Sequence, residues 1–284
     1  MEHNEVNSKY VYHYTSVQTL FHLLDAKRLN SENKENEGLD KANGVQRVSL
    51  TCENLSFLAT DIAALNDRTE YKEITNLISE MNKAKTIRLI DETIKGIPFV
   101  ISFSTLEDWL PMWLNYADDG RGVCLKFDKE ALVRNLIKKE EQYPEWIRAD
   151  LCRYSKSKEF ESLYKKVKDS NRNGIFTENI KENQQLYHEF SFQSAFLKDE
   201  SFEPECEWRL VIFVNNYLFY PNNNGRVART RIDIPLSCLK EIRLGPCAKE
   251  LDVLYVERIA NLLVDSCGTQ ICVSRSSHPY RTFN

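Results

Sequence analysis

The sequence has 284 residues, of which 42% are hydrophobic and 28% are charged, and its formal net charge is −4 at neutral pH. This is the composition of a folded globular protein, and it excludes a disordered, collagen-like or coiled-coil chain. The slightly negative charge excludes a uniformly basic surface, so that any nucleic-acid site must be a local patch.

Signals for membrane insertion, export and metal binding are missing from the sequence. The apolar runs fall well short of the roughly 20 residues that span a bilayer. The first ten residues are polar and lack the basic-then-apolar order of a signal peptide. The eight cysteines are scattered without a Cys-x-x-Cys pair, and the histidines do not stand at ligand spacing from them. We therefore expect a cytoplasmic protein with reduced cysteines, no metal and no membrane association.

The apolar patterns of the first half of the chain predict short strands and amphipathic helices. Aromatic and β-branched residues gather in runs such as 10–15 and 97–104, and leucines at helical spacing follow the first run. The expected order is a strand over 10–15, a helix over 17–29, a polar loop over 30–43, strands near 47–51 and 55–60, a helix over 69–83, a buried strand over 97–104, a helix over 108–120 and a strand over 122–127.

The second half begins with a long charged stretch whose pattern is helical, interrupted by a turn near 170–174. Strands are then expected over 207–214, 228–235, 241–245 and 270–276, with an amphipathic helix over 248–265. This order predicts a single α+β domain over 1–284, with mixed or antiparallel sheets, flanking helices and a helical insert at about 130–200. No Gly-rich loop follows an expected strand, which disfavours a Rossmann or P-loop nucleotide site.

Two polar clusters stand where helices are expected to begin. The first runs from Tyr12 to Thr15, and its His13 could hydrogen-bond a ribose hydroxyl while the helix N-terminus favours an anion nearby. The alternative is a core histidine bonded to a backbone carbonyl. The second cluster, residues 66–70, contains two residues that can cap the next helix, so we expect a structural role for it.

A third cluster combines small hydroxyl residues with an aromatic helix face. Ser102 and Ser104 end an apolar run and could brace the wall of a cleft. Met112, Trp113 and Tyr116 follow at positions i, i+1 and i+4 of the expected helix. Such a face is either part of the core or a surface on which a base or nicotinamide ring stacks.

Arg121 lies between two glycines, Gly120 and Gly122. Glycines allow the backbone to approach a ligand closely, and a guanidinium group suits a diphosphate or a carboxylate. We therefore include Arg121 among the candidates for anion binding.

A fourth cluster opens the expected strand at 207–214. Alternation predicts that Glu205, Glu207 and Arg209 lie on one face of this strand. Two neighbouring carboxylates repel, so that one of them could have a raised pKa or hold a sugar hydroxyl. The alternative is a charged face of an edge strand that pairs with Lys198.

Seven segments, taken in chain order, carry a resemblance to a known family: YHYTS, LNDRTE, FVISFS, PMWLNYADDGRGVCLKF, FLKDESFEPECEWRLV, EIRLGP and SRSSHPYRT. Over nearly the whole chain they resemble the bacterial family of domain of unknown function 2971 (DUF2971). This resemblance implies little about function, because the family is named for the lack of one.

A histidine on the first strand, a Ser-x-Ser strand and Glu-x-Glu before a late strand resemble, more distantly, the layout of the ADP-ribosyltransferase superfamily. The resemblance implies that His13 holds the ribose of NAD and that Glu207 polarises the ribose 2′-hydroxyl. Ser102 or Ser104 would support the nicotinamide pocket, and Glu205 would act on the substrate side.

Cleavage of the nicotinamide–ribose bond builds oxocarbenium character, which a carboxylate near the 2′-hydroxyl stabilises. The long spacing between His13 and Ser102 departs from a compact transferase. Tyr116 is the candidate for stacking on nicotinamide. The complete set of NAD-binding candidates is His13, Tyr14, Thr15, Ser102, Ser104, Met112, Trp113, Tyr116 and Arg121.

The superfamily resemblance implies an enzyme that uses NAD to modify nucleic acid or protein, with RNA or DNA favoured as the acceptor. Bacterial transferases of this kind usually act as toxins or anti-phage effectors, so an antitoxin or defence partner is expected. Five lysines of the helical insert, with Tyr154 and Tyr164 among them, could guide RNA or DNA: Lys156, Lys158, Lys165, Lys166 and Lys168. They could equally form a solvated helix face balanced by nearby acids.

Two alternatives lead to other functions. The same cleft could hydrolyse NAD, or it could transfer an RNA 2′-phosphate to NAD, although the latter needs more basic residues than Lys9 near the first strand. The chain could instead be a non-catalytic sensor that binds a nucleotide or a phage protein. Glu205 and Glu207 would then be salt-bridge partners of Lys198 and Arg209.

Overall fold

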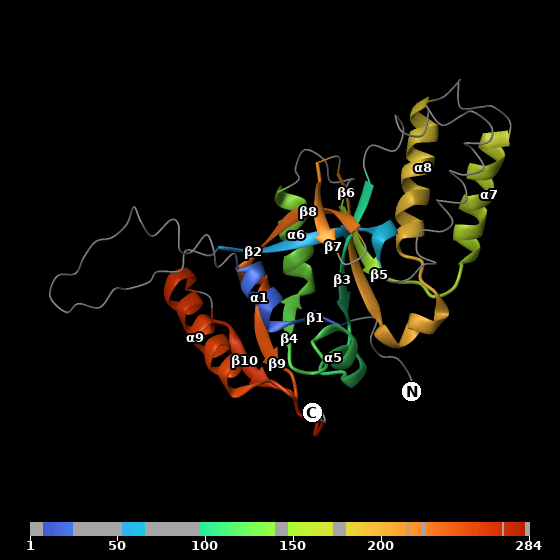
Figure 1. Cartoon of the computed structure of the whole chain (residues 1–284). Helices are drawn as coiled ribbons and strands as arrows, with labels where there is room; N and C mark the ends of the chain where they lie inside the picture. The colour runs from blue at the N-terminus through green and yellow to red at the C-terminus, as the bar shows by residue number, and fades with distance from the viewer. Residues whose placement is uncertain are drawn as a thin grey trace. The chain divides into compact units, whose positions relative to one another are not determined.

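The computed structural model describes residues 8–24, 53–65, 97–139, 147–172, 180–214, 216–222, 225–268 and 270–281 (Figure 1). They form an α+β structure with a mixed, mostly antiparallel sheet, as the sequence predicts. The chain divides into two compact units: unit 1 contains residues 1–57, 103–139 and 232–284, and unit 2 contains residues 58–102 and 140–231. Three strands contribute residues to both units: β2 (Asn54–Asp61), β3 (Ile97–Ser104) and β8 (Gly225–Pro235).

The strands of unit 1 pair in the order β10-β9-β4-β1. Their bounds are β1 (Tyr10–Thr15), β4 (Val123–Asp128), β9 (Leu239–Leu244) and β10 (Cys272–Arg275). β4 is antiparallel to both β1 and β9, whereas β9 and β10 are parallel. β1 also pairs antiparallel with the end of β3, where Tyr12 lies opposite Ser104. This register decides which side chains of unit 1 share a face of the sheet.

The described helices of unit 1 are α1 (Val17–Leu23), α5 (Leu110–Tyr116), α6 (Lys129–Lys139) and α9 (Glu250–Cys267), with a 3-10 turn η6 (Leu236–Cys238). Ser16 caps α1, because its Oγ accepts the backbone N–H of Thr19 at 3.0 Å. α9 connects the parallel strands β9 and β10 and lies alongside β10 (Figure 1). Parallel neighbours need such a crossover, whereas antiparallel strands can be joined by a short turn.

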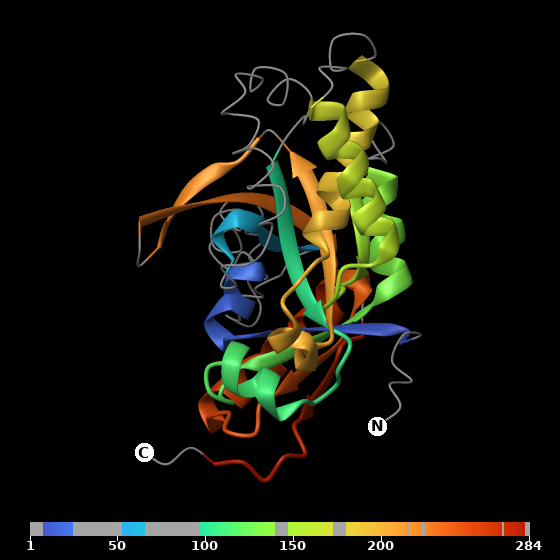
Figure 2. The same ribbon diagram turned by 90° about the vertical axis from the view of Figure 1, so that its right-hand side faces the viewer.

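Unit 2 contains the strands β5 (Ile147–Leu151), β6 (Glu207–Val214) and β7 (Leu218–Asn222), together with its parts of β2, β3 and β8, and the 3-10 turns η2 (Ile62–Ala64) and η5 (Glu200–Glu205). β6 pairs with β3 and, antiparallel, with β5. β7 and β8 form an antiparallel two-stranded ribbon. Figure 2 shows that the turn end of this ribbon points away from β3 and β6.

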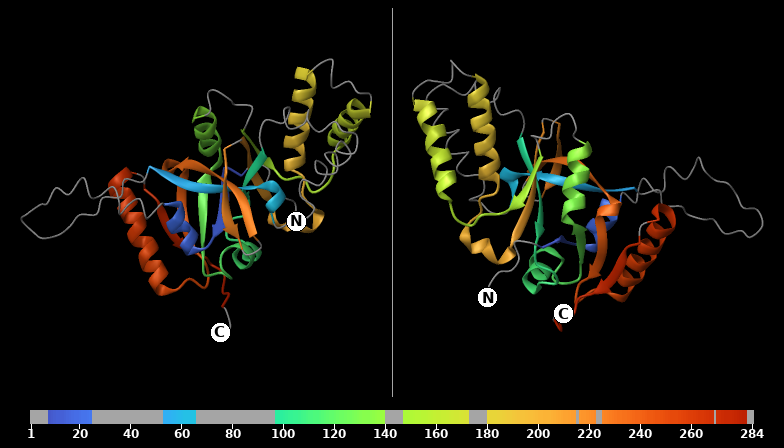
Figure 3. Two further views of the ribbon diagram at one scale, coloured as in Figure 1. Left: turned by 45° about the horizontal axis from the view of Figure 1, so that its top comes forward. Right: turned by 180° about the vertical axis from the view of Figure 1, so that it is seen from behind.

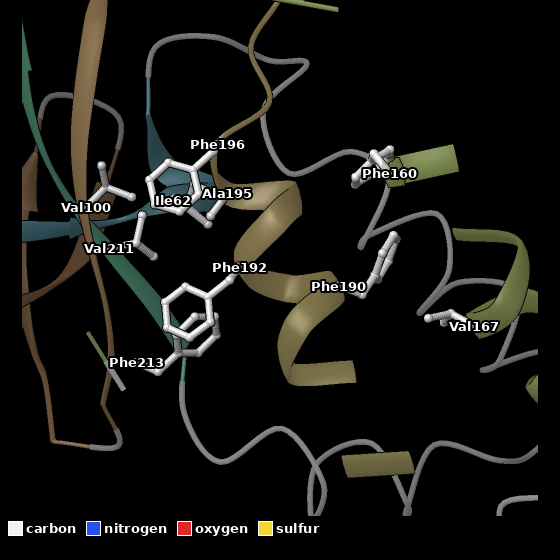
Figure 4. Close-up of a cluster of buried hydrophobic side chains, with 10 residues drawn as sticks. All are labelled: Ile62, Val100, Phe160, Val167, Phe190, Phe192, Ala195, Phe196, Val211 and Phe213. Carbon is white, nitrogen blue, oxygen red and sulfur yellow. The ribbon is translucent and has the colours of Figure 1, made fainter. Parts of the chain in front are cut away.

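Two helices of unit 2, α7 (Lys158–Arg172) and α8 (Ile180–Ala195), lie side by side (Figure 3). α8 presents Phe190 to Phe160 of α7, with the rings stacked at 5.6 Å, and Phe192 to Phe213 of β6, with the rings 4.6 Å apart (Figure 4). The buried cluster contains Ile62, Val100, Phe160, Val167, Phe190, Phe192, Ala195, Phe196, Val211 and Phe213. Aromatic packing therefore joins both helices to the strands of unit 2.

The sequence pattern predicts most of the described elements and misses two strands. It assigns residues 147–151 to the helical insert, yet they form β5, because pairing with β6 overrides a weak local pattern. It also leaves out β7, which is short and contains Pro221. The expected loop at 30–43, the strand near 47–51, the helix at 69–83 and the cluster at 66–70 lie outside the described residues.

Phe213 and Phe219 form a matched pair for testing which side chains make the core of unit 2. Phe213 is 2% exposed and Phe219 is 61% exposed. We expect Phe213→Ala to lower the free energy of unfolding by about 3–5 kcal/mol, because truncation leaves a cavity beside Phe192. Phe219→Ala should change it by about 0.5 kcal/mol or less. Urea unfolding followed by circular dichroism measures both, and equal losses would contradict this assignment of the core.

Candidate functional site

Strand β1 separates His13 from the aromatic residues with which it is predicted to bind NAD. Successive side chains of a strand point to opposite faces. Tyr14 accordingly joins a buried cluster with Trp113. The His13 ring instead meets the rings of Phe57 and Phe103 edge-on, at centroid distances of 5.1 and 5.6 Å. Within unit 1, His13 thus lies on the face of the sheet opposite Tyr14, Met112 and Trp113.

Tyr14 and Trp113 belong to the core of unit 1, together with Met112. Trp113 is fully buried, and its ring lies nearly perpendicular to that of Tyr14 at 5.0 Å. The Tyr14 hydroxyl donates to the carbonyl of Leu106 at 2.9 Å and accepts the N–H of Trp109 at 3.0 Å. For these three side chains the structure supports the core interpretation of the aromatic face.

The small hydroxyl residues and Tyr116 differ in how far they are buried. Ser104 is fully buried and its Oγ accepts the N–H of Leu106 at 3.1 Å, so it fixes the turn that follows β3. Thr15 is buried at the end of β1. Ser102 and Tyr116 are only half-buried, and Tyr116 packs against the aromatic cluster. Of these four residues, Ser102 and Tyr116 are the most exposed to solvent.

Arg121 pairs with an aspartate of its own loop, between α5 and β4. Its Nε and Nη2 each lie 3.2 Å from a carboxylate oxygen of Asp118. Asp118 and Gly120 have φ values of 50° and 79°, so the loop turns sharply. A Cβ on Gly122 would lie 2.2 Å from the carbonyl oxygen of Thr15. In this structure, Gly122 therefore allows the loop to approach β1.

Sequence reasoning missed a network of four charged side chains in unit 1. Lys126 Nζ lies 3.0 Å from Glu107 Oε1 and 3.4 Å from Glu241 Oε2. Arg243 Nη2 lies 2.6 Å from Glu107 Oε1 and 2.9 Å from Glu241 Oε1. Tyr12 adds a hydroxyl that donates to Glu107 Oε2 at 3.1 Å. We call these residues the charged network of unit 1; its two cations match its two anions.

The strand register explains why this network forms. Tyr12, Lys126 and Glu241 lie opposite one another on β1, β4 and β9, so their side chains form a row on one face. Partial burial raises the pKa of each carboxyl, but hydrogen bonds and the two cations outweigh it and lower the pKa of both below the ordinary glutamate value. Burial lowers the pKa of the two cations, and the carboxylates more than reverse that shift. All four groups are therefore charged at neutral pH.

Asp108 ties the last described segment of the chain to α5. Its carboxylate accepts the indole N–H of Trp113 at 2.8 Å, and it accepts the N–H and the hydroxyl of Ser277 at 3.0 and 3.1 Å. The ring of His278 bonds the backbone oxygen of Asp108. The motif SRSSHPYRT contains both partners, and its concentration of hydrogen-bonding side chains was the available sequence signal.

In unit 2, Glu205 and Glu207 meet at one ammonium group. Lys198 Nζ lies 2.6 Å from an oxygen of each. Arg209 donates two hydrogen bonds to the Glu207 carboxylate, from Nε to Oε1 at 2.7 Å and from Nη2 to Oε2 at 3.1 Å. Glu205 belongs to η5 and not to the strand, and Cys206 between them has a left-handed φ of 44°. The prediction that Glu205 extends the face of β6 is therefore wrong, because Cys206 breaks the alternation before the strand begins.

This ion cluster is buried and anchored to the backbone. Glu207 is 4% exposed and Arg209 is 1% exposed. The backbone N–H of Glu207 donates to the Tyr154 hydroxyl at 2.8 Å, and Arg209 Nη1 donates to the carbonyl of Ala195 at 2.8 Å. Such hydrogen bonds compensate in part for removing the charges from water.

The pKa of Glu207 and the place of β6 in the sheet both differ from what the sequence predicts. Burial alone would raise its pKa, but Arg209 and Lys198 outweigh burial and lower it to about 2. A raised pKa at this residue is thus contradicted. β6 also pairs with strands on both sides, so it is not the edge strand that the charged-face alternative assumes. The pairing of both carboxylates with Lys198, which that alternative includes, is present.

In the described part of the helical insert, the tyrosines and the lysines do not share one surface. Lys158 and Lys165 of α7 are exposed. Tyr164 packs against the aromatic core of unit 2, and the Tyr154 hydroxyl binds the backbone of Glu207. Tyr154 and Tyr164 therefore contribute to the packing of unit 2, whereas Lys158 and Lys165 lie on a solvated helix face.

Comparison with known proteins supports one assignment. The α+β chain matches, over residues 112–210, the sequence model of the family described as protein of unknown function (DUF2971), which supports placing it in that family. The matched stretch runs from α5 to β6 and contains the ion cluster around Glu207.

No curated protein and no solved structure matches the chain. Within the described ranges, none of the helices has the length and apolar character needed to cross a membrane, and His, Cys, Asp and Glu form no metal-binding group.

Glu207→Gln should destabilise unit 2 strongly at neutral pH. The amide leaves Arg209 and Lys198 with one carboxylate fewer in a buried site, which costs about 3–5 kcal/mol. Glu250→Gln is the control, because Glu250 forms an exposed pair with Arg275 at 3.3 Å, and such pairs contribute about 0–1 kcal/mol. Urea unfolding at neutral pH measures both variants, and similar midpoints would show that the cluster contributes nothing.

The same variant should abolish part of the acid sensitivity of the protein. The pKa of Glu207 is lowered by folding from 4.5 to about 2. Its stabilising contribution is therefore complete above pH 4.5 and is lost as the pH falls toward 2. Unfolding free energies of wild type and Glu207→Gln, measured across this range, should converge as the pH falls. A constant difference would contradict the assigned shift.

Proposed function

We propose that this protein acts by binding a partner, a nucleotide or a macromolecule, and that Glu207 stabilises unit 2 instead of cleaving NAD. The observation that carries this proposal is the engagement of the Glu207 carboxylate. Each of its oxygens accepts a hydrogen bond from Arg209, and one of them also binds Lys198. A catalytic carboxylate must reach its substrate. Freeing Glu207 would first disrupt a buried ion cluster, at a cost of about 3–5 kcal/mol.

The residues proposed to hold nicotinamide support the same conclusion. Trp113 is fully buried, and Tyr14 uses its hydroxyl to join two backbone segments of unit 1. A ring that is enclosed by protein on both faces cannot stack on a ligand. The strongest candidates from each unit thus contribute to the packing or ion pairing of that unit, as the sensor interpretation expects.

An ADP-ribosyltransferase-like enzyme is the second candidate, and one observation favours it. Glu207 is ionised at neutral pH, as an ordinary glutamate is, and its neighbours lower its pKa further, to about 2. An ionised carboxylate is what a ribose oxocarbenium needs for stabilisation. In this candidate NAD is the substrate and nucleic acid or protein is the acceptor, whereas water as the acceptor would make the enzyme a hydrolase. A role as a toxin or anti-phage effector would follow from the transferase chemistry.

Incubation with NAD labelled on its adenylate group, together with total RNA, DNA and cell protein, separates the two candidates. We expect neither release of nicotinamide nor transfer of label to a macromolecule, since Glu207 is engaged. A nucleotide or polynucleotide that binds the folded state should instead raise the melting temperature.

The variants for this experiment are Glu205→Gln and Glu207→Gln, with Glu250→Gln as the exposed control. Label transfer by wild type and by the control, lost in Glu205→Gln or Glu207→Gln molecules that remain folded by circular dichroism, would overturn the binding proposal. It would establish the transferase and identify the acceptor class at the same time.

A further inference from the structure

The ribbon formed by β7 and β8 is a local cationic surface. β8 carries Arg226, Arg229 and Arg231 and a single acid near its end, Asp233, which accepts a hydrogen bond from Ser56 at 2.8 Å; β7 carries no Asp or Glu. The complete chain has a net charge of −4. A slightly acidic protein needs such a segregated basic segment if it is to attract a polyanion.

The same ribbon exposes large apolar side chains. Leu218 is 65% exposed and Phe219 is 61% exposed. They are neighbours on β7, so they leave the ribbon on opposite faces. The Phe219 ring is nevertheless held in place: it meets the ring of Tyr217 at 5.7 Å, and Tyr217 meets Phe99 of β3 at 5.5 Å. The Phe219 ring is therefore exposed, and its contact with Tyr217 holds it in position.

The strand register combines charge and apolar surface on each face. Pro221 lies opposite Arg226, so Phe219, two residues before Pro221, shares a face with Arg226. Leu218 lies opposite Arg229 on the other face. Arg226 is exposed on the face of Phe219, and Arg231, farther along β8, is exposed on the face of Leu218 and Arg229. Each face thus places a guanidinium group near an exposed apolar side chain.

The combination of arginines and exposed apolar side chains indicates which kind of partner the ribbon can bind. A second copy of the ribbon would bring arginines against arginines, and Pro221 has no N–H to donate to an added strand. A polynucleotide can bind both the arginines and the exposed aromatic ring, because phosphates pair with guanidinium groups and unpaired bases stack on aromatic rings. In a duplex the base faces are covered by stacking, so the exposed Phe219 ring favours a single strand.

We propose that the β7–β8 ribbon binds single-stranded nucleic acid, with Phe219 stacking on a base, Arg226 contacting a phosphate on the same face, and Arg231 contacting a phosphate on the opposite face. The inference rests on the proposed function, for which it supplies the class of partner. RNA and DNA share the chemistry that the ribbon recognises, and the experiment separates them.

Fluorescence anisotropy with labelled oligouridine, oligodeoxythymidine and a duplex of equal length tests the proposal on the full chain. We expect both single strands to bind more tightly than the duplex. Replacing Arg226 and Arg231 together by Ala should weaken binding by about tenfold or more, and it should reduce the salt dependence by about 1.4 in log–log slope, since two phosphate contacts are lost. A difference between oligouridine and oligodeoxythymidine identifies the natural class.

Phe219→Ala tests stacking separately from charge. It should weaken binding by roughly tenfold and leave the salt slope unchanged. The matched control replaces Arg134 and Arg275 together by Ala, which removes the same charge from side chains that are 63% and 54% exposed in unit 1. That control should bind within about twofold of wild type, because its arginines lie outside the ribbon. Circular dichroism confirms that each variant is folded.

Three results would overturn the inference: absence of saturable binding by wild type, equal weakening in the control and the ribbon variants, or a duplex bound as tightly as the single strands. The labelled-NAD experiment remains independent of these outcomes. If nucleic acid fails to bind and NAD is not consumed, the ribbon inference fails while the binding proposal stands with another partner. If NAD is consumed with loss in Glu205→Gln or Glu207→Gln, the proposed function fails whatever the ribbon binds.

Discussion

The pleat of a β-strand sends neighbouring side chains to opposite faces, and both units of this protein depend on that constraint. In unit 1 it places Tyr14 in the core beside Trp113 and turns His13 toward Phe57 and Phe103. The same alternation, carried across three paired strands, places Tyr12, Lys126 and Glu241 of the charged network in one row. In unit 2 it gives each face of the β7–β8 ribbon its own mixture of charge and apolar surface. Strand register thus fixes which side chains can cooperate.

The protein uses paired charges in two different settings. Around Glu207 the charges are buried, so each hydrogen bond compensates for a large loss of hydration. In the charged network of unit 1, Glu107 keeps 41% of its side chain exposed, and water screens part of the attraction. The buried cluster therefore specifies one arrangement of the chain, whereas the network leaves its most exposed carboxylate open to solvent. Charge type alone does not distinguish these settings; burial does.

Local pattern was sufficient to predict the strands at 10–15, 97–104 and 207–214, because their apolar runs are continuous. Alternation within the first of these runs already separates His13 from Tyr14. Other features depend on partners distant in sequence. β5 exists through its pairing with β6, and Arg243 reaches Glu107 across 136 positions. A single left-handed residue, Cys206, was enough to remove Glu205 from the strand, and no periodicity reveals such a residue.

The discontinuous make-up of unit 1 has a consequence for how the chain is completed during synthesis. Strand β4 emerges early, but its partner β9 belongs to the final stretch, after residues 140–231 of unit 2. A strand that lacks its neighbour presents unpaired N–H and C=O groups. The nascent chain must therefore protect this side of β4 while unit 2 is translated, a delay of seconds at ordinary elongation rates. Once translated, the β9–α9–β10 segment is contiguous in sequence, and β9 closes the sheet through its long-range pairing with β4.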